Sequence, residues 1–158
     1  MIMSANSFDS LVDYQAQIQQ LISNAERTLC WFDADLSSSG IDKPELVASI
    51  RHFLAASNLA RVKILLQEDV WFWRKCTHLN EALGAFGHAV EVRICNEVDK
   101  VPGEQFLISE AAAVRRFYPT SMRGEASSSG TVRTLCQQRF DDLWSRAELP
   151  SEGRRLFI

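Results

Sequence analysis

Three times before residue 96, a segment with the spacing of an amphipathic helix is followed by a short apolar run. The runs cover residues 28–36, 61–67 and 88–95. They are rich in the branched and aromatic residues that favour β-strands. Because a helix separates each pair of strands, we expect right-handed crossovers and parallel strands in one sheet. This alternation constrains the fold more than any other feature of the sequence.

The helical segments also indicate where each helix begins and ends. The first, residues 7–27, has Ser7 as its expected N-terminal cap. The second begins at Pro44, a residue well suited to the first position of a helix. The third, residues 70–87, is expected to be one helix that ends at Gly87.

After residue 95 the pattern changes, because the apolar runs 104–109 and 112–118 are separated by two residues. A crossover helix does not fit there, so these strands should form an antiparallel hairpin. The polar segment 119–131 is expected to be a flexible loop, and residues 132–147 a final amphipathic helix. Residues 154–158 are expected to form an edge strand or to pack against the rest of the chain.

These elements predict an α/β fold with a mixed sheet. Its parallel strands come from β-α-β units, a C-terminal antiparallel hairpin is added to them, and helices cover both faces. The chain has 158 residues, of which 46% are hydrophobic. This length and composition suit a normal core, so we expect a single domain over residues 1–158.

Charge and hydropathy argue against several classes of function, although they leave a local basic patch possible. The net charge of −3 lacks the excess of Lys and Arg that neutralises phosphates, and this argues against nucleic acid as a partner. No apolar run approaches the roughly 20 residues that a membrane span needs. The N-terminus lacks the basic and apolar regions of a signal peptide, so we expect a cytoplasmic protein.

The cysteines and histidines do not form a metal-binding pattern. Cys30, Cys76, Cys95 and Cys136 are widely spaced and are expected to be reduced and structural. Cys76 and His78 are the one close pair, and on a helix their side chains would point in different directions. We therefore expect no metal and no cofactor.

Acidic residues follow two of the predicted strands, at the edge where open parallel sheets place their ligand crevices. They are Asp33 and Asp35 after the first strand, and Glu68 and Asp69 after the second. They could line a binding edge. Acids at such positions also cap helices, and no nucleophile or phosphate-binding glycine loop accompanies them.

Trp71 and Trp73 lie off the apolar stripe of their predicted helix and next to Arg74 and Lys75. Such aromatic residues can form the centre of a surface that contacts a partner. The alternative is that the indoles cover the sheet edge or fill a gap between helix and loop.

Arginines are locally in excess around the hairpin. Arg115, Arg116 and Arg123 lie in or after it, with Arg93 in the preceding strand. A guanidinium group suits phosphate or carboxylate, so these residues are candidates for an anion site. Arg115 and Arg116 are adjacent on a strand and point to opposite faces, so only one of the two can join a given site.

The order helix, strand, helix, strand, helix, strand, hairpin, helix resembles one half of the phospholipase D superfamily fold. The strand VEVRI and the helix CQQRFDDLW resemble the family's strand and helix on either side of its motif. That motif is His-x-Lys-x4-Asp. Laid on the segment GEQFLISE, it places Gly103 at the histidine, Gln105 at the lysine and Glu110 at the aspartate.

The resemblance implies a site without catalytic groups. In the family the histidine is the covalent nucleophile and the lysine holds phosphate, and neither Gly103 nor Gln105 supplies such a group. His88 is the nearest histidine in the sequence and a candidate for a relocated site with Glu110. The chain is also similar to a small uncharacterised bacterial domain group related to that superfamily, found alone or attached to acetyltransferase-like domains.

Three functions follow as hypotheses. The first is a catalytically inactive phospholipase D-like domain, a pseudoenzyme, that binds a protein partner or a small anionic ligand in a regulatory or accessory role. The second is a divergent phosphodiesterase or phosphotransferase with a relocated site. The third is a homodimerisation module, because superfamily members bring two such halves together.

Overall fold

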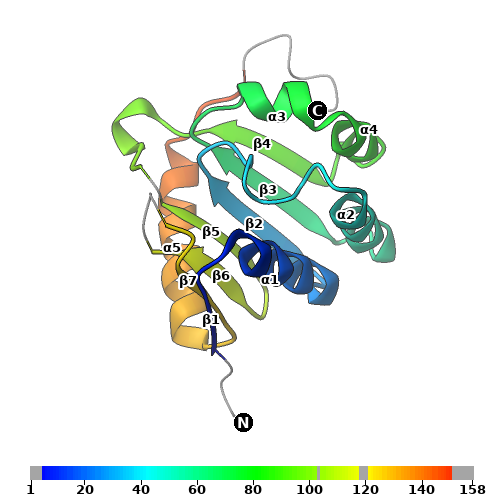
Figure 1. Cartoon of the computed structure of the whole chain (residues 1–158). Coiled ribbons are helices and arrows are strands. Elements are labelled where there is room, and N and C mark those ends of the chain that lie inside the picture. The colour runs from blue at the N-terminus through cyan, green and yellow to red at the C-terminus, as the bar shows by residue number, and fades with distance from the viewer. Residues whose placement is uncertain (1–4, 103, 118–120, 151–158) are drawn as a thin grey trace.

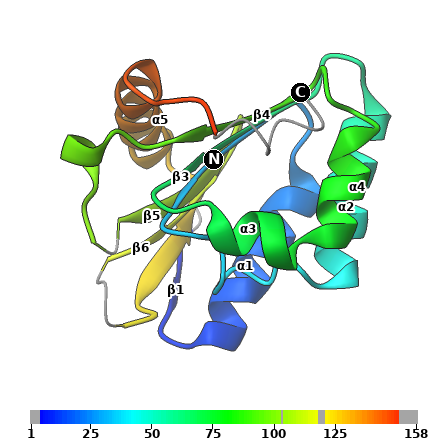
Figure 2. The same ribbon diagram turned by 90° about the horizontal axis from the view of Figure 1, so that it is seen from above.

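A computed structural model describes residues 5–102, 104–117 and 121–150. Within these ranges the chain forms one mixed sheet with helices on both of its faces (Figures 1 and 2), as the sequence predicts. In chain order the elements are β1 (Ala5–Phe8), α1 (Leu11–Asn24), β2 (Thr28–Asp33), α2 (Pro44–Ala56), β3 (Arg61–Leu66), α3 (Val70–Lys75), α4 (Thr77–Gly84), β4 (Val90–Ile94), the 3₁₀ turn η1 (Glu97–Asp99), β5 (Gln105–Ser109), β6 (Ala113–Arg116), β7 (Gly124–Ser127) and α5 (Gly130–Ser145).

The described sheet has the strand order β1-β7-β6-β5-β2-β3-β4. Strands β2, β3 and β4 are parallel, and β5 pairs with β2 in the antiparallel direction. The predicted hairpin of β5 and β6 is present, and β7 and β1 extend the sheet beyond it. The carboxyl end of β2 therefore lies beside the first residue of β5.

The helices bury two separate apolar clusters against the sheet. One face carries α1, α2 and α4, which pack on residues such as Trp31, Ile64 and Leu107. The other carries α5, which packs through Phe140 on the alternate residues, among them Phe106. This division follows from the two-residue period of strands, because successive side chains point to opposite faces.

Two strands were not predicted from the sequence. The ends of the sheet at β1 and β7 are short and carry few apolar residues, so their alternation gives no strand signal. Segment 119–131, predicted as a flexible loop, therefore contains a strand. The N-terminal cap of α1 is Ser10, whose side chain accepts a hydrogen bond from the N–H of Asp13. Ser7, the predicted cap, instead lies in β1 and pairs with Glu125 of β7.

The predicted helix over residues 70–87 is two helices. The break lies at Cys76, whose φ and ψ of −101° and 47° are outside the helical region. Among the described residues, no helix is both long enough and apolar enough to cross a membrane. The predicted segment 154–158 lies outside the described residues.

Candidate functional site

A buried chain of hydrogen bonds joins β6, β5 and β2 where the motif of the resemblance begins. Arg116 Nη1 donates to Oε1 of Gln105 over 2.7 Å, and Gln105 Nε2 donates to Oδ1 of Asp33 over 3.1 Å. Gln105 and Arg116 are direct partners in the β5–β6 register. All three side chains point to the face covered by α1, where the Arg116 guanidinium lies 5.9 Å from the ring centre of Tyr14.

Asp33 is the buried acid of this cluster, with none of its surface exposed. Its Oδ1 also accepts from the backbone N–H groups of Asp35 and Leu36, at 3.2 and 3.0 Å. No described residue donates to its Oδ2. Burial raises the pKa of Asp33 to about 6, although the two backbone donors and Arg116 act in the opposite direction. The carboxyl group therefore titrates within two units of neutral pH.

Both the nitrogen and the oxygen of the Gln105 amide form hydrogen bonds within the cluster, so Gln105 links Asp33 to Arg116. It is 6% exposed, with its nitrogen on Asp33 and its oxygen on Arg116. Arg116 further donates from Nε and Nη2 to the carbonyl oxygen of Ser121, at 3.2 and 2.7 Å. The cluster thus holds the ends of β2, β5 and β6 together.

Glu110 lies at the opposite end of β5. Its carboxylate accepts from three consecutive backbone N–H groups, those of Glu26, Arg27 and Thr28, at 3.0, 2.9 and 3.2 Å. Burial acts to raise its pKa, but these donors outweigh burial and hold the pKa below its usual range. Since β5 is five residues long, about 16 Å separates this group from Gln105. Gly103 lies outside the described residues.

The four candidate arginines do not converge. Arg115 points to the α5 face and pairs with Glu125 over 2.8 Å, whereas Arg116 points to the α1 face, as predicted for adjacent residues. Arg93 lies on β4, at the far edge of the sheet from β6, and binds Glu91 and the carbonyl oxygen of Trp144. Arg123 is exposed and lines a small depression of about 290 Å³.

His88 and Glu110 are also apart. His88 is exposed and precedes β4, while Glu110 follows β5, and the strand order places β2 and β3 between them. Three strand spacings amount to about 14 Å. The Glu110 carboxylate is directed to the backbone of residues 26–28, and the geometry brings no base to it.

The remaining candidates have local roles. Trp71 and Trp73 are half-buried, and Trp73 Nε1 donates to Oδ2 of Asp69 over 2.9 Å. Asp35 accepts from the Ser37 hydroxyl, and Glu68 pairs with Lys100. The four cysteines are free and buried. Within the described ranges, no three His, Cys, Asp or Glu side chains are grouped so that they could hold a metal ion.

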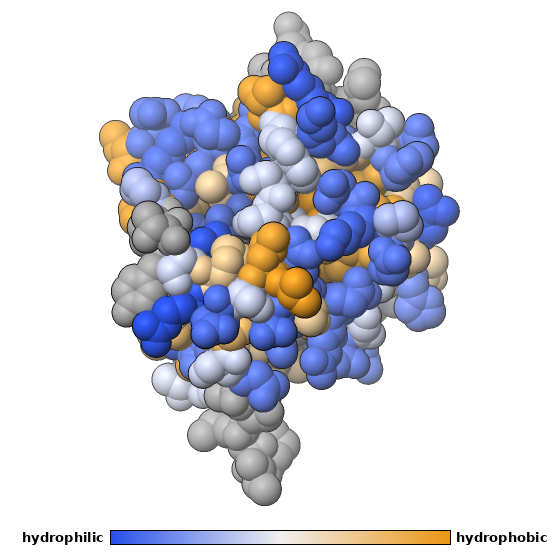
Figure 3. All heavy atoms as spheres, viewed as in Figure 1, coloured by the Kyte–Doolittle hydropathy of each residue, from blue (hydrophilic) through white to orange (hydrophobic). Residues whose placement is uncertain are grey.

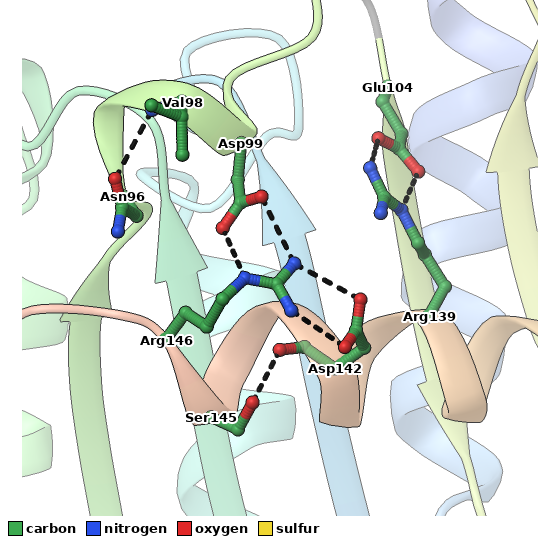
Figure 4. Close-up of polar contacts among 8 residues, drawn as sticks. All are labelled: Asn96, Val98, Asp99, Glu104, Arg139, Asp142, Ser145 and Arg146. Carbon is green, nitrogen blue, oxygen red and sulfur yellow. Dashed lines mark hydrogen bonds and ion pairs between the residues drawn. The ribbon is translucent and has the colours of Figure 1, made fainter.

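The segment that leads into β5 is held by α5 (Figure 4). Arg139 makes two hydrogen bonds with the carboxylate of Glu104, at 2.8 and 2.9 Å. Arg146 does the same with Asp99 and also binds Asp142. These contacts fix the start of β5 relative to α5. No sequence pattern predicted these contacts, because the partners in each pair that joins α5 to the segment before β5 are far apart along the chain.

The family model described as "Domain of unknown function (DUF7931)" matches residues 10–156. No curated protein matches the chain in sequence. Among solved structures, TrmBL2, an archaeal chromatin protein, is similar with a TM-score of 0.69 and 13% identity over 92% of this chain. The chain spans about half, 54%, of that protein.

A second similar structure is NucT from Helicobacter pylori, a nuclease of the phospholipase D superfamily. It has a TM-score of 0.65 and 9% identity, and the match covers 94% of this chain and 100% of NucT. The fold of the chain is therefore phospholipase D-like.

The prediction that argued against nucleic acid as a partner is wrong. Both similar structures are associated with nucleic acid, one as a DNA-binding chromatin protein and the other as a nuclease. The prediction used the net charge of the whole chain. Net charge does not describe how charges are distributed over separate faces, and a local surface can attract phosphates on an acidic protein.

Proposed function

We propose that this chain, which belongs to the DUF7931 family, is a phospholipase D-like domain that binds nucleic acid and does not hydrolyse it. The observation that carries the proposal is the position and the hydrogen bonding of Gln105. It occupies the register of the family's phosphate-holding lysine in the resemblance, and it is buried between Asp33 and Arg116.

The arrangement around Gln105 opposes phosphodiester chemistry. An amide supplies no charge to stabilise a transferring phosphoryl group, and Gly103 supplies no nucleophile. Asp33, a buried acid whose pKa is about 6, would repel phosphate when it is ionised. The hydrogen bonds of this cluster connect strands to one another, which supports a structural role for the former motif.

Binding of nucleic acid is supported by the shared fold. The match covers 54% of TrmBL2, which is an archaeal chromatin protein with a described mode of DNA binding. Such binding requires positive groups that reach phosphate oxygens, and it requires no nucleophile. Loss of chemistry at the motif is therefore compatible with a binding role.

The other two hypotheses gain no support from the described contacts. A relocated catalytic site would need His88 near Glu110, and two strands separate them. A homodimerisation role stays a prediction from the resemblance.

Two measurements on the purified chain test the proposal. The first follows cleavage of labelled single-stranded DNA, duplex DNA and RNA, together with a chromogenic phosphodiester. The second follows fluorescence anisotropy of the same labelled nucleic acids. We expect binding that weakens with salt and no cleavage above a buffer control. Cleavage that is retained through purification and altered in a Gln105→Ala variant would overturn the first part, and absence of binding to all three nucleic acids would overturn the second.

A further inference from the structure

The loop between β2 and α2, residues 34–43, holds a bulky residue in an unfavourable backbone conformation. Leu36 has a φ of 70°, which is in the left-handed region, and it is the one residue other than glycine with a positive φ in the part of the chain that the structure describes. Its side chain is nevertheless completely buried. Such a conformation persists only where surrounding contacts hold it in place, so the contacts of this loop determine whether it stays closed.

Asp33, the last residue of β2, supplies two of these contacts. Its Oδ1 accepts from the N–H groups of Asp35 and Leu36, at 3.2 and 3.0 Å. Ser39 supplies two more, because its Oγ donates to the carbonyl oxygen of Leu36 over 2.6 Å and accepts from the N–H of Ile41 over 3.1 Å. Of the two residues, Asp33 carries a group that titrates, whereas the hydroxyl of serine stays neutral.

The loop (cyan in Figure 1) follows the carboxyl end of β2 and lies at the surface. Figure 3 shows residues of nearly neutral hydropathy at its position, next to the hydrophobic atoms that are exposed over α1. Ser37 is exposed, and so are Asp42 and Lys43 at the junction with α2. Movement of residues 35–41 away from the sheet is therefore directed into solvent. It would remove two hydrogen-bond donors from Asp33 and admit water to a carboxyl group that is completely buried in the closed loop.

The surroundings of Asp33 favour its protonated form while the loop is closed. Within the described part of the chain its Oδ2 has no hydrogen-bond partner. The groups that face it are Arg116 of β6, Asp35 of the loop, the neutral amide of Gln105 and Tyr14 of α1, whose own pKa is raised by burial well above its ordinary value. Burial outweighs Arg116 and the backbone donors and raises the pKa of Asp33 to about 6. In an open loop water reaches the carboxyl group and its pKa returns towards the ordinary 3.8, so ionisation favours opening.

We infer that the β2–α2 loop is a pH-sensitive element, which is closed when Asp33 is protonated and opens locally over residues 35–41 when Asp33 ionises. Opening also releases Leu36 from its left-handed conformation, so the strain of the closed loop acts in the same direction as the charge. Solvent access to the cluster of Asp33, Gln105 and Arg116 then depends on pH. The inference goes beyond the proposed function and is independent of it.

The test measures amide hydrogen exchange of the full chain by NMR across the range from about pH 4 to about pH 8. Protection factors are compared, because they correct for the pH dependence of the intrinsic exchange rate. With a pKa of about 6 in the closed loop and 3.8 in the open loop, the opening constant should rise on the order of a hundredfold, mostly between about pH 4 and 6. The N–H of Leu36 should lose protection by this factor. The N–H of Phe140, inside α5, reports global unfolding and should be better protected than that of Leu36 at each pH.

Two variants identify the group that controls the loop. Asparagine at position 33 keeps an Oδ1 acceptor and does not titrate, so in Asp33→Asn the protection of Leu36 should stay constant over this range. Asp35→Asn is the matched control, because it removes a carboxylate from the same loop and leaves Asp33 in place. The protection of Leu36 in Asp35→Asn should fall with pH as it does in the unaltered chain.

Three results would overturn the inference. The first is protection of Leu36 that does not change with pH in the unaltered chain. The second is equal protection of Leu36 and Phe140 at every pH, because the loop would then open only through global unfolding. The third is pH dependence that persists in Asp33→Asn or disappears in Asp35→Asn, since a group other than Asp33 would then control the loop. The first two comparisons need only the unaltered chain, so they decide the inference even if Asp33→Asn does not fold.

Discussion

Gln105 Nε2 donates a hydrogen bond to Oδ1 of Asp33 over 3.1 Å, across 72 positions of sequence and inside the protein. Both side chains are buried, so water cannot replace the bond if one partner is removed. A buried polar group without its partner costs more free energy than the bond itself contributes. This relationship makes the hydrogen bond between Gln105 and Asp33 a determinant of stability.

The Gln105→Ala variant should therefore lose stability. Removal of the amide leaves Asp33 Oδ1 and an Arg116 N–H each without one partner, and we expect the free energy of unfolding to fall by about 2–3 kcal/mol. Urea unfolding followed by circular dichroism measures this change. Gln20→Ala, at an exposed position of α1, is the control and should stay within about 0.5 kcal/mol. Equal losses in the two variants would show that the cluster adds nothing.

Asp33 should make stability depend on pH. Its pKa of about 6 in the folded chain is above the ordinary value of 3.8, so the folded state binds the proton more tightly. The stability from this proton is fully present below about pH 4 and is lost as pH rises through about 6, with a total near 3 kcal/mol.

The Asp33→Asn variant tests this linkage, because asparagine does not titrate. Relative to the variant, the unaltered chain should become progressively less stable between about pH 4 and 6, and the difference should be constant above about pH 7. Urea midpoints across this range measure it. Parallel stability curves for the two proteins would contradict a raised pKa of Asp33.

Sequence patterns predicted the elements that depend on local periodicity. The three parallel strands and the hairpin strands are short apolar runs, α5 has apolar residues at helical spacing, and the structure contains all of these elements. Strands β1 and β7 were not predicted, because each is four residues long and mostly polar. They pair with each other across more than 100 positions of sequence, and local periodicity does not indicate such a pairing. The break at Cys76 was also missed, since no glycine or proline marks it.

The candidate site could be predicted only in part. The sequence indicated Asp33 as an acid at a strand end, Gln105 as a position of the motif and Arg116 as a candidate for an anion site. The hydrogen bonds that join the three residues were not predicted. Those bonds depend on the register of β5 against β2 and β6. Register is set by packing and turn geometry across the whole sheet, so it cannot be predicted from the periodicity of one strand.

Glu110 should be important for the connection between α1 and β2. Its carboxylate is the acceptor for three backbone N–H groups, so Glu110→Ala should lower the free energy of unfolding by about 2 kcal/mol. Since its pKa is lowered in the folded chain, the stabilisation is present above the ordinary value of 4.5 and is lost as pH falls through the folded value. Chemical unfolding at neutral pH measures the loss. Glu45→Ala, at an exposed position of α2, is the control, and an equal effect there would contradict this role.

Gly124 and Gly130 form a matched pair for testing how closely β7 packs. A Cβ at Gly124 would collide with the carbonyl oxygen of Arg115 and with the ring of Phe8, whereas a Cβ at Gly130 would meet nothing within 4 Å. Gly124→Ala should lower the free energy of unfolding by about 2–3 kcal/mol, because the backbone of β6 cannot move aside without breaking its ladder. Gly130→Ala, in the first turn of α5, should be neutral or stabilising by up to about 1 kcal/mol. Thermal unfolding of both variants measures the difference, and a Gly124→Ala protein as stable as Gly130→Ala would show that β1 and β7 do not pack as closely as described.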